Sequence, residues 1–134
     1  MKQKKSTEDY LKTICILAFR DGVRGADLAK ALQVSRPTVS VALKALEQEG
    51  YVRMGKTHLV YLTERGLAVA KDMYDRHQTF QALLIGLGVD KETAARDACE
   101  LEHSVSAKSF CAIKRALQTG METEKNNKSG PNGT

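Results

Sequence analysis

Residues 51–63 interrupt the helical pattern of the chain, and this interruption constrains the fold more than any other feature. The segment carries Tyr51-Val52 at its start and Leu59-Val60-Tyr61-Leu62 at its end, around Met54-Gly-Lys-Thr-His58. Two short runs rich in β-branched and aromatic residues, separated by a Gly-containing turn, are typical of a β-hairpin. We therefore expect a two-stranded hairpin with a basic tip in a chain that is otherwise helical.

Three stretches of helical spacing precede the hairpin. The first extends from a cap at Ser6 or Thr7 to about Asp21-Gly22. The second and third are predicted over residues 25–32 and 36–49, and only three residues separate them. Ser35 suits the N-cap of the third helix, and Gly50 suits its C-terminal end. Helix, helix, tight turn, helix and hairpin is the order of a winged helix-turn-helix domain.

The helix after the tight turn of such a domain presents its N-terminal residues to base edges in the major groove. Hydroxyl and guanidinium groups bond bases or phosphates, and lysines suit phosphates. If these residues were only structural, the hydroxyls would cap the helix and the lysines would be solvated. The start of this helix lacks acidic residues, which favours DNA binding, although some winged helices contact proteins instead. The residues expected to contact DNA are Ser35, Arg36, Pro37, Thr38, Ser40, Lys44 and Lys56.

The composition is compatible with this interpretation and excludes other classes of protein. The chain has 134 residues, enough for one domain or a small domain with an accessory one, and 42% of them are hydrophobic. No apolar run is long enough to span a membrane, and no signal-peptide core follows the basic N-terminus, so we expect a cytoplasmic protein. Three cysteines, an odd number, argue against a disulfide framework. The net charge of +5 suits a nucleic-acid partner without demonstrating one.

Three further helices are predicted after the hairpin. The first runs from Thr63 or Glu64 to about Leu87, the second is capped by Asp90, and the last lies between Ser106 and Gly120. Residues 121–134 are polar and aperiodic, so we expect a disordered tail there.

A thiol, a carboxylate and an imidazole recur on one predicted helix. Cys99, Glu102 and His103 stand at positions i, i+3 and i+4, so their side chains leave the same helix face. Such a set can bind a metal ion of intermediate softness. Taken alone, it is equally explained by a core cysteine, a solvated glutamate and a hydrogen-bonded histidine.

The order of the elements resembles that of the diphtheria toxin repressor family over roughly residues 5–118. The resemblance is carried by Thr7-Glu-Asp-Tyr-Leu11, Ser35-Arg-Pro-Thr-Val-Ser40, Arg76-His77 and Cys99-Glu-Leu-Glu-His103. It implies a repressor of metal-uptake genes, not an enzyme, that binds double-stranded operator DNA as a homodimer when loaded with a divalent metal. The implied fold is mainly α: a winged helix-turn-helix DNA-binding domain over residues 1–70, then an all-helical metal-binding and dimerisation domain over residues 71–120. The length is similar to that of the manganese transport regulator branch, which lacks an SH3-like third domain.

The resemblance also implies a set of metal ligands. Asp9, His77, Glu102 and His103 match ligand positions of the manganese branch, which has Glu where this chain has Cys99. The Cys99-x-x-Glu102-His103 pattern is instead similar to the iron-responsive branch, which has Met at the position of Asp9. Lys12 stands where the manganese branch has a Glu ligand, which argues against a second ion. Because a thiolate favours softer metals than Mn²⁺, we expect Fe²⁺ first, with Mn²⁺, Co²⁺, Ni²⁺ or Zn²⁺ as alternatives.

Two other functions compete with a metal-dependent repressor. A winged-helix regulator without metal would sense oxidation of Cys99 or Cys111, and such a sensor needs an exposed thiol of low pKa. A small metalloenzyme is disfavoured, because the sequence offers no evident nucleophile and base pair.

Overall fold

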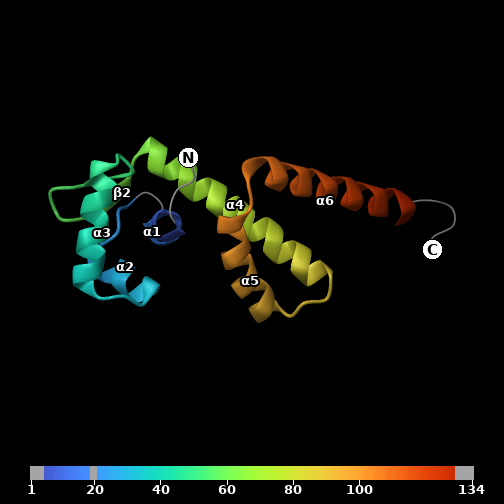
Figure 1. The fold of residues 1–134 in the computed structure, drawn as a ribbon, viewed down its shortest axis with the longest axis horizontal. Coiled ribbons are helices and arrows are strands. Elements are labelled where there is room, and N and C mark those ends of the chain that lie inside the picture. The colour runs from blue at the N-terminus through green and yellow to red at the C-terminus, as the bar shows by residue number, and fades with distance from the viewer. Residues whose placement is uncertain (1–4, 19–20, 129–134) are drawn as a thin grey trace. The chain divides into compact units, whose positions relative to one another are not determined.

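The computed structural model describes residues 5–18 and 21–128, and its chain divides into two compact units, one ending at Asp75 and the other beginning at Arg76. The predicted mainly α fold with one small hairpin is confirmed (Figure 1). The elements are α1 (Lys5–Ala18), α2 (Gly25–Leu32), α3 (Arg36–Gln48), β1 (Val52–Met54), β2 (Val60–Leu62), α4 (Glu64–Gly86), α5 (Lys91–Ser104) and α6 (Ala107–Lys128).

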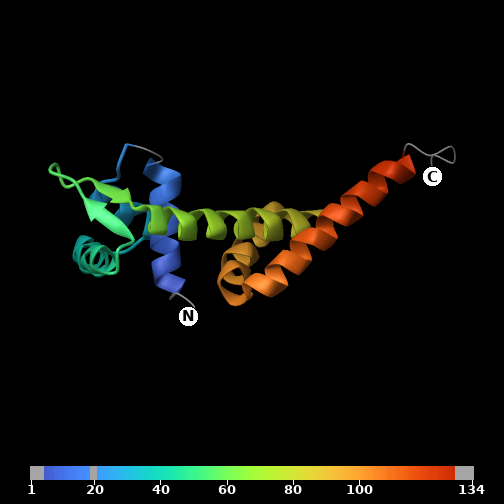
Figure 2. The same ribbon diagram turned by 90° about the horizontal axis from the view of Figure 1, so that it is seen from above.

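The first unit is a winged helix-turn-helix. Strands β1 and β2 pair antiparallel, with Arg53 opposite Tyr61, and form the wing drawn as arrows in Figure 2. Val23, between α1 and α2, adds an isolated bridge to Val60 through two backbone hydrogen bonds of 2.8 and 2.9 Å, which the sequence pattern did not predict. One apolar cluster joins all these elements, and its fully enclosed members include Leu11, Ile14, Leu28, Val39, Val52 and Val60.

Local side-chain hydrogen bonds define the helix starts that the sequence predicted. The Ser35 hydroxyl accepts the backbone N–H of Thr38 at 3.2 Å and caps α3. Asp90 caps α5 by accepting the backbone N–H of Thr93 at 3.0 Å. Hydrogen bonds from the backbone and the side chain of Thr93 lower the pKa of Asp90. Gly50 follows α3 with a φ of 83°, which confirms it as the residue that ends this helix.

The first turn of α4 packs tightly against the start of β1. The Thr63 hydroxyl donates to the carbonyl of Gly50 at 2.6 Å and accepts the backbone N–H of Gly66 at 3.1 Å. The guanidinium of Arg65 lies 4.4 Å from the centre of the Tyr51 ring and donates to the carbonyl of Glu49 at 2.9 Å. A side chain at Gly66 would therefore meet backbone, since its Cβ would lie 2.0 Å from the carbonyl oxygen of Tyr51.

Replacing Gly66 with Ala is expected to destabilise the chain by about 3 kcal/mol, because neither the helix backbone nor the backbone of Tyr51 can yield at this contact. Gly86→Ala is the matched control: no atom lies within 4 Å of the added Cβ, so this change is expected to stabilise α4 by about 0.5 kcal/mol. Urea unfolding of both variants measures the difference. Equal stability of the two variants would contradict the close packing of α4 on Tyr51.

The second unit is built from α5, α6 and the end of α4 around Phe80, Ala98 and Phe110. The Phe80 and Phe110 ring centroids lie 5.8 Å apart. The predicted end of the last helix at Gly120 is wrong, because α6 continues to Lys128. A single Gly costs a helix about 1 kcal/mol, which neighbouring residues of high helix propensity offset. The predicted disordered tail is thus helical up to Lys128, and residues 129–134 lie outside the described residues.

Two further findings concern the helices. The first described residue, Lys5, is already part of α1, so Ser6 and Thr7 lie within the helix instead of capping it. Among the described residues, no helix combines the length and apolar character needed to cross a membrane.

Candidate metal centre and nucleic-acid interface

Three potential metal donors from α4 and α5 converge within the second unit. The Nδ1 atom of His77 lies 3.1 Å from Oε2 of Glu102 and 3.7 Å from Sγ of Cys99. All three donor atoms lie within 4.8 Å of one another. The helical spacing of Cys99 and Glu102 places both on the face of α5 that meets His77.

Glu102 is the centre of this cluster. Its side chain is fully buried, and its second carboxylate oxygen lies 3.3 Å from Nε2 of His103. A buried carboxylate needs compensation of its charge, which protonated imidazole or a bound cation can provide. Two imidazoles therefore share one enclosed carboxylate, and the exposed thiol of Cys99 lies beside it.

The donor set fits a divalent transition metal. Ligand atoms at 2.0–2.3 Å from a tetrahedral ion lie about 3.3–3.8 Å from one another. The separations of 3.1 and 3.7 Å around His77 are close to this range, so small side-chain shifts would admit an ion. Imidazole, thiolate and carboxylate suit Fe²⁺, Co²⁺, Ni²⁺ and Zn²⁺, and an ion held here would neutralise the buried charge of Glu102.

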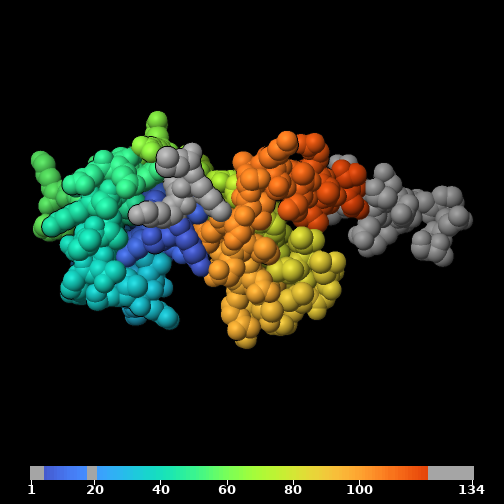
Figure 3. All heavy atoms as spheres, viewed as in Figure 1, coloured from blue at the N-terminus to red at the C-terminus, as the bar shows by residue number. Residues whose placement is uncertain are grey.

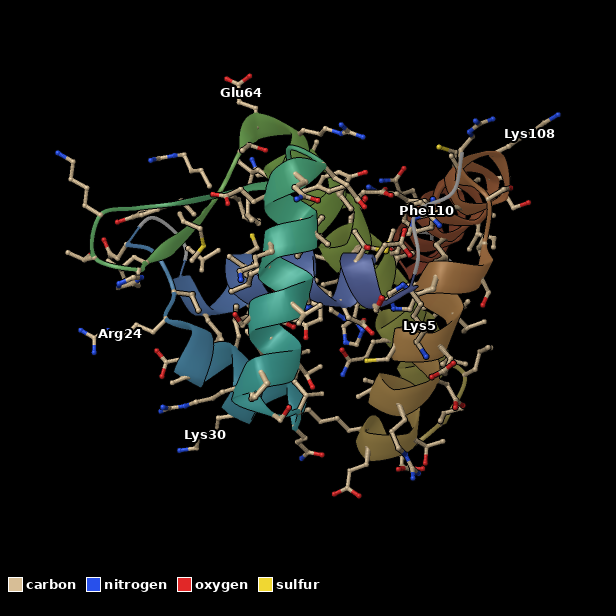
Figure 4. The ribbon with its side chains drawn as sticks, turned by 60° about the vertical axis from the view of Figure 1, so that its left-hand side comes forward. Lys5, Arg24, Lys30, Glu64, Lys108 and Phe110 are labelled. Carbon is tan, nitrogen blue, oxygen red and sulfur yellow. The ribbon has the colours of Figure 1, made fainter. Side chains whose placement is uncertain are left out.

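Arg76 holds the end of α5 that carries these potential ligands. This buried side chain donates to the carbonyl of Glu102 at 3.3 Å and to that of Val105. Its guanidinium also lies 5.2 Å from the centre of the ring of Phe110, which is labelled in Figure 4. In the sequence, Arg76 stands out only as part of the Arg76-His77 motif. Its position next to His77 was the one signal in the sequence that Arg76 belongs to the site. Its hydrogen-bond partners could not be predicted, because they are backbone carbonyls, which every residue has.

The remaining predicted ligand and the other cysteines have different environments. Asp9 is half-buried on α1 in the first unit, so its part in the ligand set stays a prediction. Lys12, also on α1, is half-buried. Cys15 is half-buried against the apolar cluster of the first unit, and Cys111 is an exposed free thiol on α6.

A groove of about 520 Å³ lies between α3, the start of α2 and the wing in the first unit. Arg36, Ser40 and Lys44, three of the predicted DNA contacts, line it from α3. Figure 3 shows α2 and α3 as part of the surface of this unit. Figure 4 looks onto α3, with the labelled Lys30 of α2 and Arg24, which precedes α2, to one side. The structure therefore groups basic and hydroxyl side chains along one accessible groove.

The other predicted DNA contacts lie near this groove or at the wing. Ser35, Pro37 and Thr38 are exposed at the start of α3, and Lys56 is exposed at the tip of the wing. Three residues of the groove were not among the predicted DNA contacts. Met54 and His58 line it from the wing, and the carboxylate of Glu47 accepts the backbone N–H of Met54 at 3.2 Å. Only the folding of the wing towards α3 brings these residues together.

Comparison with known proteins supports both halves of this description. The family described as "Iron dependent repressor, N-terminal DNA binding domain" matches residues 3–59. The family described as "Iron dependent repressor, metal binding and dimerisation domain" matches residues 63–128.

Individual relatives are similar to this chain over most of its length. The transcriptional regulator MntR of Salmonella typhimurium is 37% identical over 112 residues, which cover 83% of this chain and 71% of that protein. The manganese regulator SloR has a similar structure, with a TM-score of 0.75, 31% identity and coverage of 88% of this chain and 55% of that one. The structure of ScaR with bound Zn²⁺ has a TM-score of 0.73 and 30% identity, covering 84% of this chain and 53% of that one. This chain thus spans about half the length of the two solved chains.

These relatives are regulators of transcription, not enzymes. One assignment follows from the winged helix-turn-helix half, the convergent donor cluster of the other half, and relatives that match across both halves. The chain belongs to the iron-dependent repressor family of the diphtheria toxin repressor and MntR, whose members are metal-dependent transcriptional regulators.

Proposed function

We propose that this chain represses genes for metal uptake, acting in the cytoplasm as a homodimer that binds operator DNA when loaded with a divalent transition metal. The observation that carries the proposal is the convergence of His77, Cys99 and His103 on the buried carboxylate of Glu102, in a chain whose other half is a winged helix-turn-helix. The match to a dimerisation domain over residues 63–128 supports the homodimer.

The proposed metal is softer than Mn²⁺. Cys99 offers a thiolate, which favours Fe²⁺, Co²⁺, Ni²⁺ or Zn²⁺, whereas Mn²⁺ prefers oxygen ligands and binds most weakly in the divalent series. Fe²⁺ is our first choice. The relatives support a divalent metal without selecting one, since SloR is named a manganese regulator and ScaR binds Zn²⁺.

The test of this function is DNA binding measured across Fe²⁺, Mn²⁺, Co²⁺, Ni²⁺ and Zn²⁺, with a chelated control. The probe is a set of duplexes enriched from a random library by the metal-loaded full chain. Tight binding that needs metal supports the proposal. Affinity that is unchanged by chelation, but lost on mild oxidation and restored by a thiol reductant, would instead support a thiol-sensing regulator.

We further propose that Asp9 completes the ligand set and that each chain holds a single ion. Both points rest on the sequence resemblance. The ammonium of Lys12, one helical turn from Asp9, would repel a second dication. Lys12→Glu is therefore expected to raise the metal stoichiometry from one ion per chain towards two, as measured by equilibrium dialysis with metal analysis. Lys30→Glu, an equal charge change on α2, is the control and should leave one ion. Two ions bound by the unmodified chain would contradict the role given to Lys12.

The proposed DNA contacts are Ser35, Arg36, Pro37, Thr38, Ser40, Lys44 and Lys56. If Arg36 pairs with a guanine, Arg36→Ala should weaken binding to the enriched duplex by about 1–3 kcal/mol and affect random duplex much less. Lys56→Ala, at the wing tip, is the contrasting control and should weaken binding to both duplexes. It should also lower the slope of log affinity against log salt concentration by about one, because one fewer counterion is released. Titrations at several salt concentrations measure both effects. An equal loss for Arg36→Ala on both duplexes would show that Arg36 contacts only phosphate.

A further inference from the structure

The solvent-facing side of α3 carries a strongly exposed apolar residue, Val41. Val39, Leu43 and Leu46 are the buried residues of this helix, and at 3.6 residues per turn Val41 lies almost opposite their mean direction. Val41 is 70% exposed, more than any other large apolar side chain described in the first unit. A β-branched residue has only modest helix propensity, and an exposed one adds no packing, so the stability of α3 does not explain this valine.

The surroundings of Val41 indicate what covers it. Arg36, Ser40 and Lys44 follow one another at intervals of four residues, so they form the neighbouring line along the same helix. The first turn of α3 has no acidic residue, and Glu47 and Glu49 lie only at its end. An apolar position beside a line of cationic and hydroxyl groups is complementary to DNA, which presents phosphates at the rims of the major groove and thymine methyl groups within it.

We propose that Val41 determines operator specificity by packing against the methyl group of a thymine. This inference rests on the proposed function, because it needs α3 to lie in the major groove. Thymine is the only base whose major-groove edge carries a methyl group, so Val41 would favour thymine over cytosine at the position it touches. Burial of one methyl group corresponds to about a fourfold gain in affinity for each contacted thymine.

Deoxyuridine tests the contact, because it removes the methyl group and leaves every hydrogen-bonding group of thymidine unchanged. Each thymidine of the enriched duplex is replaced in turn by deoxyuridine. The affinity of the full chain, loaded with the metal that activates it best, is then measured for each duplex. We expect about fourfold weaker binding at one thymine position per half-site. Val41→Ala should weaken binding to the thymidine duplex by a similar factor and abolish the difference at that position. Val41→Ile should retain the difference.

Ile16→Ala is the matched control, since Ile16 is 58% exposed on α1, and this variant should show the same difference between thymidine and deoxyuridine as the unmodified chain. The inference is overturned if no deoxyuridine substitution weakens binding, or if Val41→Ala keeps the full difference. If the chain still bound an enriched duplex in a metal-dependent way, the proposed function would stand even though this inference had failed. Failure of the chain to enrich any duplex would overturn both.

Discussion

Replacing His77 with Ala is expected to abolish the activation of DNA binding by divalent metal while leaving the chain folded. The imidazole of His77 lies 3.1 Å from the buried carboxylate of Glu102 and 3.7 Å from the thiol of Cys99, so its loss removes the one donor contributed by α4. Coupling between two ligands of one protein is typically worth 1–3 kcal/mol, so metal should raise the DNA affinity of the unmodified chain by about 5- to 150-fold. The variant should show no such increase.

His103→Ala should behave in the same way, because it removes the partner of the second oxygen of Glu102. The third histidine of the chain offers the control. His58 lies in the wing, so His58→Ala should keep the ratio of DNA affinities with and without metal, whatever it does to the affinity itself. Circular dichroism reports the fold of each variant. A folded His77→Ala variant with an undiminished response to metal would refute this ligand set.

The same coupling can be measured from the other side. Linkage requires that operator DNA tighten metal binding by the factor with which metal tightens DNA binding. Metal titrations with and without the enriched duplex therefore give an independent value for the unmodified chain, and the two factors must agree.

Replacing Cys99 with Glu is expected to shift activation towards Mn²⁺. The substitution exchanges a soft thiolate for a hard carboxylate on the same face of α5, beside His77 and Glu102. Activation by Mn²⁺ relative to Co²⁺ or Zn²⁺ should rise by about tenfold or more, as oxygen ligands suit Mn²⁺. The measurement is the concentration of each metal needed for half-maximal DNA binding.

Cys111→Glu is the matched control, because Cys111, like Cys99, is an exposed cysteine but lies on α6. It should leave the order of metals unchanged. Co²⁺ adds a spectroscopic test: a sulfur-to-metal absorption band should be present in the unmodified chain and in Cys111→Glu, and absent from Cys99→Glu. An unmodified chain that responds best to Mn²⁺ and shows no such band would contradict the role of Cys99.

Much of the fold follows from local sequence. The cap residues Ser35, Asp90 and Ser106 act within three residues of their partners, so the starts of α3, α5 and α6 were predicted from the chain alone. The change from helical to alternating spacing likewise located the wing. The ends of the chain were less predictable. Gly120 does not end α6, because the cost of one glycine within a helix is small compared with the sum over its neighbours.

The sequence determined one part of the candidate metal site, and the tertiary structure determined the rest. Helical spacing determined that Cys99, Glu102 and His103 share one face, but it did not determine what that face meets. His77 is 25 residues from Glu102 in the chain, and only the packing of α4 on α5 places its ring against the carboxylate. Burial also depends on the assembled unit: Glu102, a charged residue of ordinary appearance in the sequence, is fully enclosed.

The candidate DNA interface on α3 was likewise determined partly by the sequence and partly by the tertiary structure. The sequence determined that Arg36, Ser40 and Lys44 lie off the buried stripe, since helical periodicity alone separates the two sides. The groove they line exists only because β1 and β2 fold back towards α3 and bring Met54 and His58 to its other wall. The exposure of Val41 and the bridge between Val23 and Val60 also needed the tertiary structure, because both depend on which distant segments cover a residue and which do not.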